Sequence, residues 1–360
     1  MRSAVVIAAI AGLTTANPVV SRQTGAQTGI DLSAFDADKT PVKTGPAVGA
    51  TFEQPTYNSE QGQAAAAEDA IKNPVIPAKR DLMPRTNGCD QKEPNGYGPV
   101  SNPDTYDQFM SDPLYSNIAQ NAPVPDGYSQ SFADLSGSAE GPGYLGLYTM
   151  QSFNTIECQQ HCDAADSCYG FNVFMERNPS YTPSDTCENP PSVTNFKCTL
   201  WGLPITPQTA TNVGQWRNQF HVGIRGSNGY VKLAPPPPQD GFNGPIEFGG
   251  STQAPYSYMG VKFFSGPYDP SQCASACKAT TQYDHDHPRA DGTYDACNFF
   301  NSFILSEDGV PQGTYCAMYT QSWDKSYSTN VGQWRGSDYF SVSQSYGYSL
   351  ATPDSGVISS

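Results

Sequence analysis

The sequence predicts an α+β fold of two small disulfide-stapled modules, each with one helix packed on an antiparallel sheet, after a disordered N-terminal region. The heptad Thr-Asn-Val-Gly-Gln-Trp-Arg occurs at 211–217 and again at 329–335, each time 13 residues after a cysteine. Four cysteines recur at matching positions in the two copies, and the short apolar runs around them alternate as β-strands do. These observations indicate that one cysteine-bearing unit was duplicated within the chain.

The composition favours small, loop-rich domains over one large core. The 360 residues are 37% hydrophobic and include 33 glycines and 31 prolines, and the formal net charge is −15. Nucleic acids and anionic membrane surfaces are bound by basic patches, so we expect neither as a partner of this acidic chain.

The beginning of the chain predicts secretion. Met1–Ala16 has the basic start, short apolar run and small terminal residues of a signal peptide. That run is too short to span a bilayer, and no later stretch approaches about 18 apolar residues, so no transmembrane segment is expected. Residues 17–80 lack cysteine and are poor in aromatics, which predicts disorder. They end in Lys79-Arg80, a candidate dibasic processing site that would make them a propeptide.

The rest of the chain divides by composition and by the repeat. We expect an accessory segment at 81–125, the first module at 126–230, a Pro-rich linker at 231–239, the second module at 240–348 and a flexible tail at 349–360. Each module is expected to begin with a strand, continue into a helix and end with several strands.

Each predicted helix carries two cysteines four residues apart, which places both thiols on one helix face. Asn154 and Asp269 each precede a Glu or Gln by three residues, the capping-box pattern of a helix start, and Pro270 suits a first helical position. Two strand motifs follow, Cys-x-x-Phe-Asn-x-Phe and Cys-x-(Leu/Met)-(Trp/Tyr), whose aromatics suit a buried sheet. They stand at 168–174 and 198–201 in the first copy, and at 297–303 and 316–319 in the second.

Ten cysteines in an exported chain predict disulfides rather than metal ligands. Four cysteines close each module with two bridges, and three pairings are possible, between which the residues alone do not choose. Cys89 and Cys187 lie outside the repeated set, and we expect them to pair with each other.

The order of these motifs resembles the PAN/Apple domain family over roughly 126–225 and 240–342. The resemblance implies that nested bridges join each helix to its sheet, and that the modules bind proteins or carbohydrates without being catalysts. Two such modules behind a signal peptide also resemble secreted fungal proteins. The chain departs from the family by insertions at 176–197 and 280–296 and by lacking an outer bridge between domain termini. The pairings implied are Cys158–Cys198, Cys162–Cys168, Cys273–Cys316 and Cys277–Cys297.

The polar cluster Asp284-His285-Asp286-His287 is a candidate for binding Zn²⁺ or Cu²⁺. In an extended loop the two histidines would point the same way, and the aspartates could complete the ligand set. The alternative, which we favour, is a solvated polar loop, and no cofactor is expected.

Trp216 and Trp334, the tryptophans of the repeated heptad, are candidates for stacking on the sugar rings of a glycan. A shared scaffold role explains the identity of the two heptads as well, and on that ground we expect both side chains in the core or at a strand edge. Arg217 and Arg335 are the matching ligand-binding candidates, and each is expected to pair with a carboxylate inside its module.

The predicted function is non-catalytic binding of glycans or proteins outside the cell, including cell-wall polysaccharide. The chain contains no Gly-x-Ser-x-Gly, no His-Glu-x-x-His and no phosphate-binding glycine loop, so we do not expect an enzyme. Two modules on one chain would gain avidity on a polymeric ligand. The alternatives are a structural or adhesive wall component and, third, a hydrolase or metal-dependent enzyme.

Overall fold

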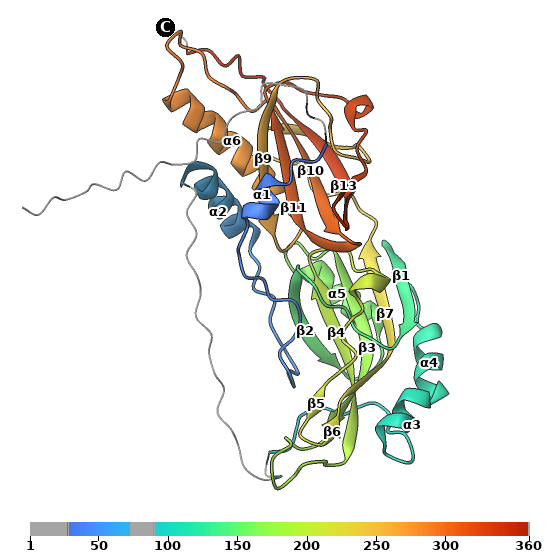
Figure 1. Ribbon diagram of the computed structural model, residues 1–360. Coiled ribbons are helices and arrows are strands. Elements are labelled where there is room, and N and C mark those ends of the chain that lie inside the picture. The colour runs from blue at the N-terminus through green and yellow to red at the C-terminus, as the bar shows by residue number, and fades with distance from the viewer. Residues whose placement is uncertain (1–26, 28, 73–88, 90, 359–360) are drawn as a thin grey trace, which may run out of the picture.

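The structure, a computed structural model, describes residues 27, 29–72, 89 and 91–358. It is an α+β fold in which two antiparallel sheets lie end to end and helices lie against them (Figure 1). The predicted signal peptide and the pair Lys79-Arg80 lie outside the described residues.

The first sheet has the strand order β1-β7-β3-β4-β2, and α5 packs across β3 and β4. A separate small hairpin, β5–β6, precedes β7, and the helices α3 and α4 pack on β7. The strands are β1 (Tyr128–Leu135), β2 (Tyr144–Met150), β3 (Gly170–Pro179), β4 (Ser192–Trp201), β5 (Trp216–Arg217), β6 (Phe220–His221) and β7 (Gly223–Lys232). The helices are α3 (Tyr106–Ser111), α4 (Pro113–Gln120), α5 (Thr155–Ala164) and the 3₁₀ turn η1 (Pro207–Thr209).

The second sheet has the strand order β12-β13-β10-β11-β9, with β8 also paired to β13, and α6 packs across β10 and β11. The strands are β8 (Phe242–Glu247), β9 (Tyr258–Ser265), β10 (Phe299–Glu307), β11 (Val310–Tyr319), β12 (Gly332–Arg335) and β13 (Asp338–Leu350). The helices are α6 (Pro270–Asp286) and the 3₁₀ turn η2 (Lys325–Tyr327).

Both main helices begin where the capping residues predict. The Asn154 side chain accepts hydrogen bonds from the backbone N–H groups of Ile156 and Glu157 at the start of α5. At the start of α6, the carboxylate of Asp269 accepts from the N–H of Ser271, with Pro270 in the first turn. These caps satisfy N–H groups that have no partner inside the helix.

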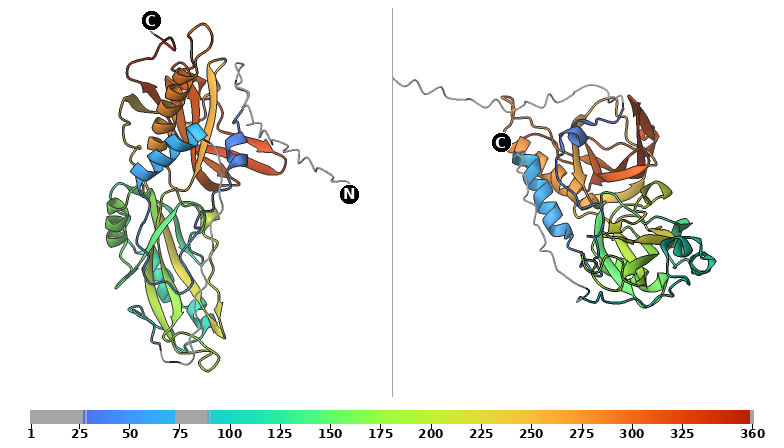
Figure 2. Two further views of the ribbon diagram at one scale, coloured as in Figure 1. Left: turned by 90° about the vertical axis from the view of Figure 1, so that its left-hand side faces the viewer. Right: turned by 60° about the horizontal axis from the view of Figure 1, so that its bottom comes forward.

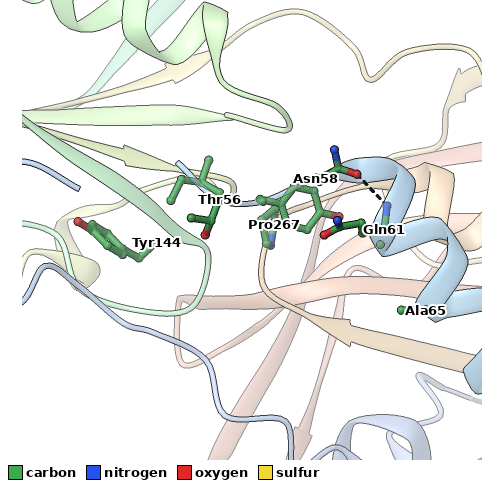
Figure 3. Close-up of a pocket in the computed structure, with 9 residues that line it drawn as sticks. Thr56, Asn58, Gln61, Ala65, Tyr144 and Pro267 are labelled. Atoms are coloured by element: carbon green, nitrogen blue, oxygen red, sulfur yellow. Dashed lines mark hydrogen bonds between the residues drawn. The ribbon is translucent and has the colours of Figure 1, made fainter. Parts of the chain in front are cut away.

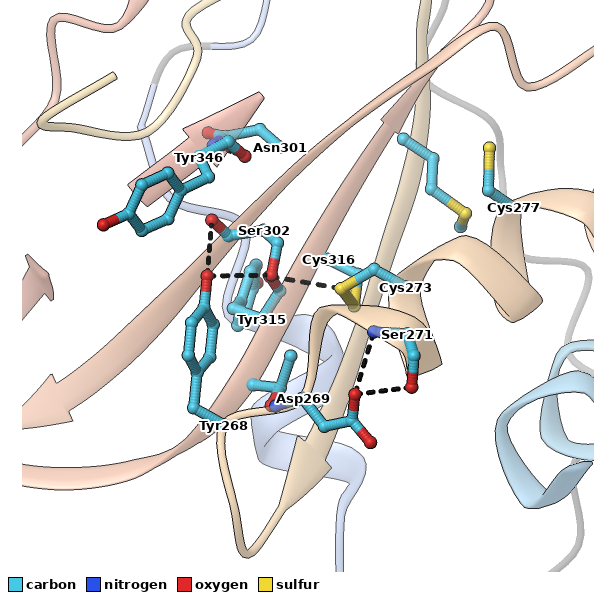
Figure 4. Close-up of a disulfide and its surroundings, with 12 residues drawn as sticks. Tyr268, Asp269, Ser271, Cys273, Cys277, Asn301, Ser302, Tyr315, Cys316 and Tyr346 are labelled. Carbon is cyan, nitrogen blue, oxygen red and sulfur yellow. Dashed lines mark hydrogen bonds between the residues drawn. A yellow bond between two sulfur atoms is a disulfide. The ribbon is translucent and has the colours of Figure 1, made fainter. Parts of the chain in front are cut away.

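All ten cysteines are among the described residues, and they form five disulfides. In each half, one bridge joins the main helix to a strand of its sheet and a second joins it to the residues just before the central strand. Figure 4 shows a bridge of the first kind, between α6 and β11. The pairs are Cys158–Cys198, Cys162–Cys168, Cys273–Cys316, Cys277–Cys297 and Cys89–Cys187, which are the pairings that the resemblance and the cysteine count had led us to expect.

A fully buried asparagine lies at the centre of each sheet, in the Phe-Asn-x-Phe motif. Asn172 accepts from the N–H of Ala139 (2.8 Å) and donates to the Ser227 hydroxyl (2.9 Å) and the Asn228 carbonyl (2.8 Å). Asn301 makes the equivalent three hydrogen bonds. Its partners are the N–H of Thr252 (2.9 Å), the hydroxyl of Ser345 (2.9 Å) and the carbonyl of Tyr346 (3.1 Å). Each amide therefore ties the central strand to the last strand and to the loop between the first two strands of its sheet.

The expectation that 17–80 is disordered does not hold for residues 29–72. They form the helices α1 (Ser33–Ala37) and α2 (Ser59–Lys72), and the segment runs along both sheets. Ile30, Leu32 and Ala66 are buried. The burial of these side chains against partners far along the chain offsets the entropy that a weakly apolar segment loses on ordering.

The expected flexible tail is also ordered as far as residue 358. The strand β13 continues to Leu350, and the Asp354 carboxylate then accepts a hydrogen bond from the Tyr294 hydroxyl (2.8 Å). The Asn298 side chain bonds both backbone groups of Asp354. These side-chain contacts hold a segment whose composition alone predicts mobility.

The inserted loops and the linker are partly regular structure. The insertion at 176–197 lengthens the β3–β4 hairpin, and the insertion at 280–296 extends α6 by two turns. The first two residues of the predicted Pro-rich linker, 231 and 232, belong to β7. Further along the linker, the Pro237 carbonyl accepts a hydrogen bond from the Tyr348 hydroxyl.

One close contact between the two halves lies just after β4. Gly202, after β4, lies so near Pro267 that a Cβ on this glycine would stand 2.4 Å from the proline ring. The next residue, Tyr268, donates its backbone N–H to the Gly202 carbonyl (2.7 Å), and the rings of Tyr169 and Tyr268 meet edge to face. Only glycine permits this approach.

We expect Asn172→Ala to lower the free energy of unfolding by about 2–3 kcal/mol, because the buried N–H of Ala139 and the Asn228 carbonyl lose their partner. Urea unfolding followed by tryptophan fluorescence measures this. The exposed Asn243→Ala is the matched control and should change the value by less than about 0.5 kcal/mol. An unchanged midpoint for Asn172→Ala would contradict the assigned role.

Candidate functional site

The two copies of the heptad enter their hairpins in the same way. A 3₁₀ turn, η1 or η2, ends two residues before each heptad. The heptad asparagine, Asn212 or Asn330, then pairs in an antiparallel bridge with Ser138 or Ser251. Ser138 directly precedes Ala139, whose N–H donates to the buried Asn172. Ser251 directly precedes Thr252, whose N–H donates to the buried Asn301.

The same asparagines then turn the chain. Asn212 accepts a hydrogen bond through its side chain from the N–H of Gly214 (3.0 Å), and Asn330 does the same for Gly332 (2.9 Å). Such side-chain-to-backbone bonds form Asx turns, which explains the asparagine two residues before a glycine in both copies. At Gly214, φ is +96° and a Cβ would stand 2.2 Å from the Val222 carbonyl oxygen, so this position requires glycine.

Each heptad leads into a short hairpin that places an aromatic ring opposite the tryptophan. We call residues 211–221 the first heptad hairpin and residues 329–339 the second. Trp216 pairs with His221 across the first hairpin, and their rings stack at 4.1 Å. Trp334 pairs with Tyr339 across the second, with ring centroids 5.0 Å apart.

Neither tryptophan lies in the core. Both are exposed on strands at a sheet edge, Trp334 on β12 and Trp216 on β5, which is the second of the two positions that we had expected. Trp216 is 64% exposed and Trp334 70% exposed, although each rests on its cross-strand partner. The heptad valines, Val213 and Val331, are 59% and 60% exposed. A valine and a tryptophan are therefore exposed at the same two positions of each copy. Apolar residues scattered singly over a surface would not recur at matching positions in this way.

The opposite side of the second heptad hairpin holds the N-terminal segment. Gln333 pairs with the backbone of Ile30 in both directions, accepting from its N–H (2.7 Å) and donating to its carbonyl (2.9 Å). Two residues on, Arg335 forms an ion pair with Asp36 at 2.5 Å. Because alternate residues of a strand face opposite sides, Gln333 and Arg335 lie on the side of the N-terminal segment, where Arg335 stays exposed, and Trp334 points to the other side.

The first heptad hairpin also binds a segment from outside its own half. Arg217 forms an ion pair with Glu93 at 2.6 Å in the segment 81–125, and Gly49 of the N-terminal segment lies against its guanidinium. The expectation that Arg217 and Arg335 pair inside their modules is therefore wrong. Their carboxylate partners lie N-terminal to both repeats, and no local pattern in the sequence joins them.

An additional ring supports the first heptad hairpin. Tyr106 of α3 stacks on His221 at 3.6 Å, so the histidine lies between Tyr106 and Trp216. Partial desolvation, together with the charge of Arg177, lowers the pKa of His221, and Asp107 acts in the opposite direction. The stack is therefore uncharged at neutral pH, and the outer face of Trp216 remains open.

Carboxylates surround the second heptad hairpin. Desolvation, followed by repulsion from Asp338 and Asp308, raises the pKa of Glu307, and the nearby Arg335 opposes this. A polymer carrying many negative charges would meet repulsion here, so this surface favours an uncharged ligand.

The structure does not support the predicted metal site. Asp284, His285 and Asp286 lie in the last turn of α6 rather than in an extended loop, and His287 is the residue that ends the helix. Helical spacing turns neighbouring side chains to different sides, so the two histidines do not point the same way. In the described residues, no three His, Cys, Asp or Glu side chains are grouped as metal ligands would be.

The four histidines of the chain all contact aromatic rings. His161 stacks on Tyr148 at 3.8 Å, and His287 stacks on Tyr283 at 4.4 Å. His285 meets the ring of Tyr294 edge to face, and His221 lies in the stack described above. Packing against an aromatic ring thus explains the position of each imidazole.

One shallow pocket, of about 390 Å³, lies between α2, β2 and the loop before α6 (Figure 3). Thr56, Asn58, Gln61 and Tyr144 line it, and the Asn58 side chain accepts from the N–H of Gln61. This bond caps the start of α2, so the polar groups here already serve the fold.

The chain was compared with protein-family models, curated proteins and solved structures, and none of them matched. Among the described residues, no helix is long and apolar enough to cross a membrane.

We expect Glu307→Gln to stabilise the protein slightly at pH 7, by less than about 1 kcal/mol. A carboxyl whose pKa is raised on folding binds its proton more tightly in the folded state, so its ionised form destabilises the fold above that pKa. The gain should vanish near pH 3, where the carboxyl is protonated in both states. Melting temperatures of both proteins at the two pH values test this, and a lower melting temperature for the variant at pH 7 would contradict it.

Proposed function

We propose that the protein is an extracellular, non-catalytic binding protein whose two halves are PAN/Apple-like modules. Five disulfides suit an oxidising compartment. Each half carries one helix joined by two bridges to an antiparallel sheet, which is the arrangement that the resemblance implies. The ligand-binding elements are the two heptad hairpins.

One observation carries this proposal: both hairpins support a tryptophan on a second ring and expose it. The stem of each hairpin contains an Asx turn and an arginine ion pair, which is largely buried at Arg217 and exposed at Arg335. An exposed indole supplies a large apolar face with few rotatable bonds, which suits recognition at low entropic cost.

A neutral polysaccharide is the ligand class that this arrangement favours. The C–H face of a pyranose ring is flat and apolar, and it packs on an exposed indole as another ring would. The net charge of −15 and the carboxylates near Trp334 disfavour polyanions. Two tryptophans on one chain would bind a repeating polymer with avidity.

A protein ligand is the second candidate, and the exposed valines favour it. Val213 and Val331 add aliphatic surface beside each indole, and tryptophan is enriched where protein interfaces gain most of their energy. A glycan stacks on the ring face alone, whereas a protein partner would also bury the valine.

We expect Trp216→Ala and Trp334→Ala each to weaken retention on an insoluble neutral polysaccharide by about tenfold or more, and the double variant to abolish it, because avidity requires both sites. Pull-down of the full-length protein with chitin, cellulose and β-glucan measures this. Both variants should keep the wild-type melting temperature within a few degrees, since the indoles lie in solvent.

The matched control is Tyr97→Ala, which removes an aromatic ring that is 54% exposed and lies outside the heptads. Its retention should equal that of the wild type. Retention that survives the double tryptophan variant would place glycan binding elsewhere. No retention on any polymer, combined with binding to a protein that Val213→Asp and Val331→Asp abolish, would favour the second candidate.

A further inference from the structure

The second sheet has an apolar face that its own helix does not cover. Alternate residues of β10 and β11 face α6. Between them, Phe303, Leu305 and Tyr315 form a separate cluster with Phe263 of β9 and Phe340 of β13. Ile30 and Leu32 of the N-terminal segment belong to this cluster. Phe35 meets the rings of Phe263 and Phe340 edge to face, at 5.2 and 5.5 Å.

Polar contacts fix the register of the segment on this face. Besides Gln333 and Arg335, Gln253 accepts from the N–H of Gly29 (2.6 Å), and Tyr258 donates its hydroxyl to Asp31 (2.9 Å). The Tyr319 hydroxyl donates to the side chain of Gln27 (2.7 Å). Such contacts, repeated along the segment, specify one sequence in one register rather than any apolar peptide.

The segment then crosses to α6 and packs along it. Figure 2 shows α2 beside α6 in both views, and the alanine-rich helix α2 approaches α6 closely at Gly62 and at the buried Ala66. Asp69 pairs with Lys262 at 2.8 Å. Tyr57 and Ser59 donate to Asp269, the residue that caps α6 (Figure 4 shows this carboxylate and its bonds to Ser271).

No covalent bond besides the polypeptide itself joins this segment to the rest of the chain. Cys89 is the first cysteine of the sequence, so no disulfide can involve residues 29–72. The dibasic pair Lys79-Arg80 stands between Lys72 and Cys89 in the sequence.

We propose that the face formed by Phe263, Phe303 and Phe340, together with α6, is a binding surface whose partner is the chain's own segment 29–72. The segment is a resident part of the fold. Cleavage at Lys79-Arg80 therefore yields a two-chain protein that remains assembled without a covalent link, instead of releasing a propeptide. The inward sides of both heptad hairpins stay occupied after the cut.

The experiment treats the secreted full-length protein with a kexin-type endoprotease and follows both fragments by mass spectrometry. In native buffer at low micromolar concentration, we expect them to co-elute on gel filtration in equal amounts, and to separate in denaturant. Two fragments that separate in native buffer overturn the proposal, as does a chain that resists cleavage at the pair.

Two variants localise the interaction. Leu32→Asp should release the N-terminal fragment after cleavage, because it places a charge in the apolar cluster. Lys262→Ala, which disturbs no apolar contact, should shift the midpoint of fragment release to lower denaturant. Val48→Asp changes an exposed residue of the same segment and should leave co-elution intact. Release by Val48→Asp as readily as by Leu32→Asp would mean that the sheet face does not hold the segment.

Discussion

Two buried side-chain amides, those of Asn172 and Asn301, fix the positions of the hairpins that carry the exposed tryptophans. Each amide ties the central strand of its sheet to the last strand. Each also accepts a hydrogen bond from a loop residue, Ala139 or Thr252, and the serine before that residue pairs with the heptad asparagine. That asparagine turns the chain at the heptad glycine, and the tryptophan two residues later faces outward. A buried amide with unmet partners costs about 1–3 kcal/mol, so these strands cannot shift register without loss. The exposed indole is thus positioned from the core.

The parts of the fold that the sequence predicted depend on local signals. A capping residue three before Glu or Gln marks a helix start wherever it occurs, and Asn154 and Asp269 behave accordingly. Cysteines four apart face one way on any helix, which predicts that both thiols of α5 and of α6 leave the helix on the same side. The pairings themselves were implied by the resemblance to the PAN/Apple family, because the residues alone left three pairings open in each module.

What the sequence did not predict depends on contacts across long separations. The segment 29–72 is weakly apolar, and its order comes from Ile30 and Leu32 meeting a sheet face more than 200 residues further along the chain. The candidate metal site is not supported, because His285 and His287 share a side only in an extended chain. The polar loop that we favoured instead is the end of α6. The sequence left the tryptophans between the core and a strand edge, because identity between two copies shows a shared role but not the side of the strand on which it is performed.

The alternation of a strand explains why the whole heptad is repeated and not its tryptophan alone. In the second copy, Gln333 and Arg335 hold the N-terminal segment inward, and Trp334 between them points outward. A change to Gln333 would remove the two hydrogen bonds that join this hairpin to the backbone of Ile30. A hairpin clamped on its inner side loses little conformational entropy when the outer ring binds a ligand, and that saving appears directly as affinity. The scaffold role and the proposed ligand role, which the sequence posed as alternatives, are therefore compatible, because different residues of the same hairpin would perform them.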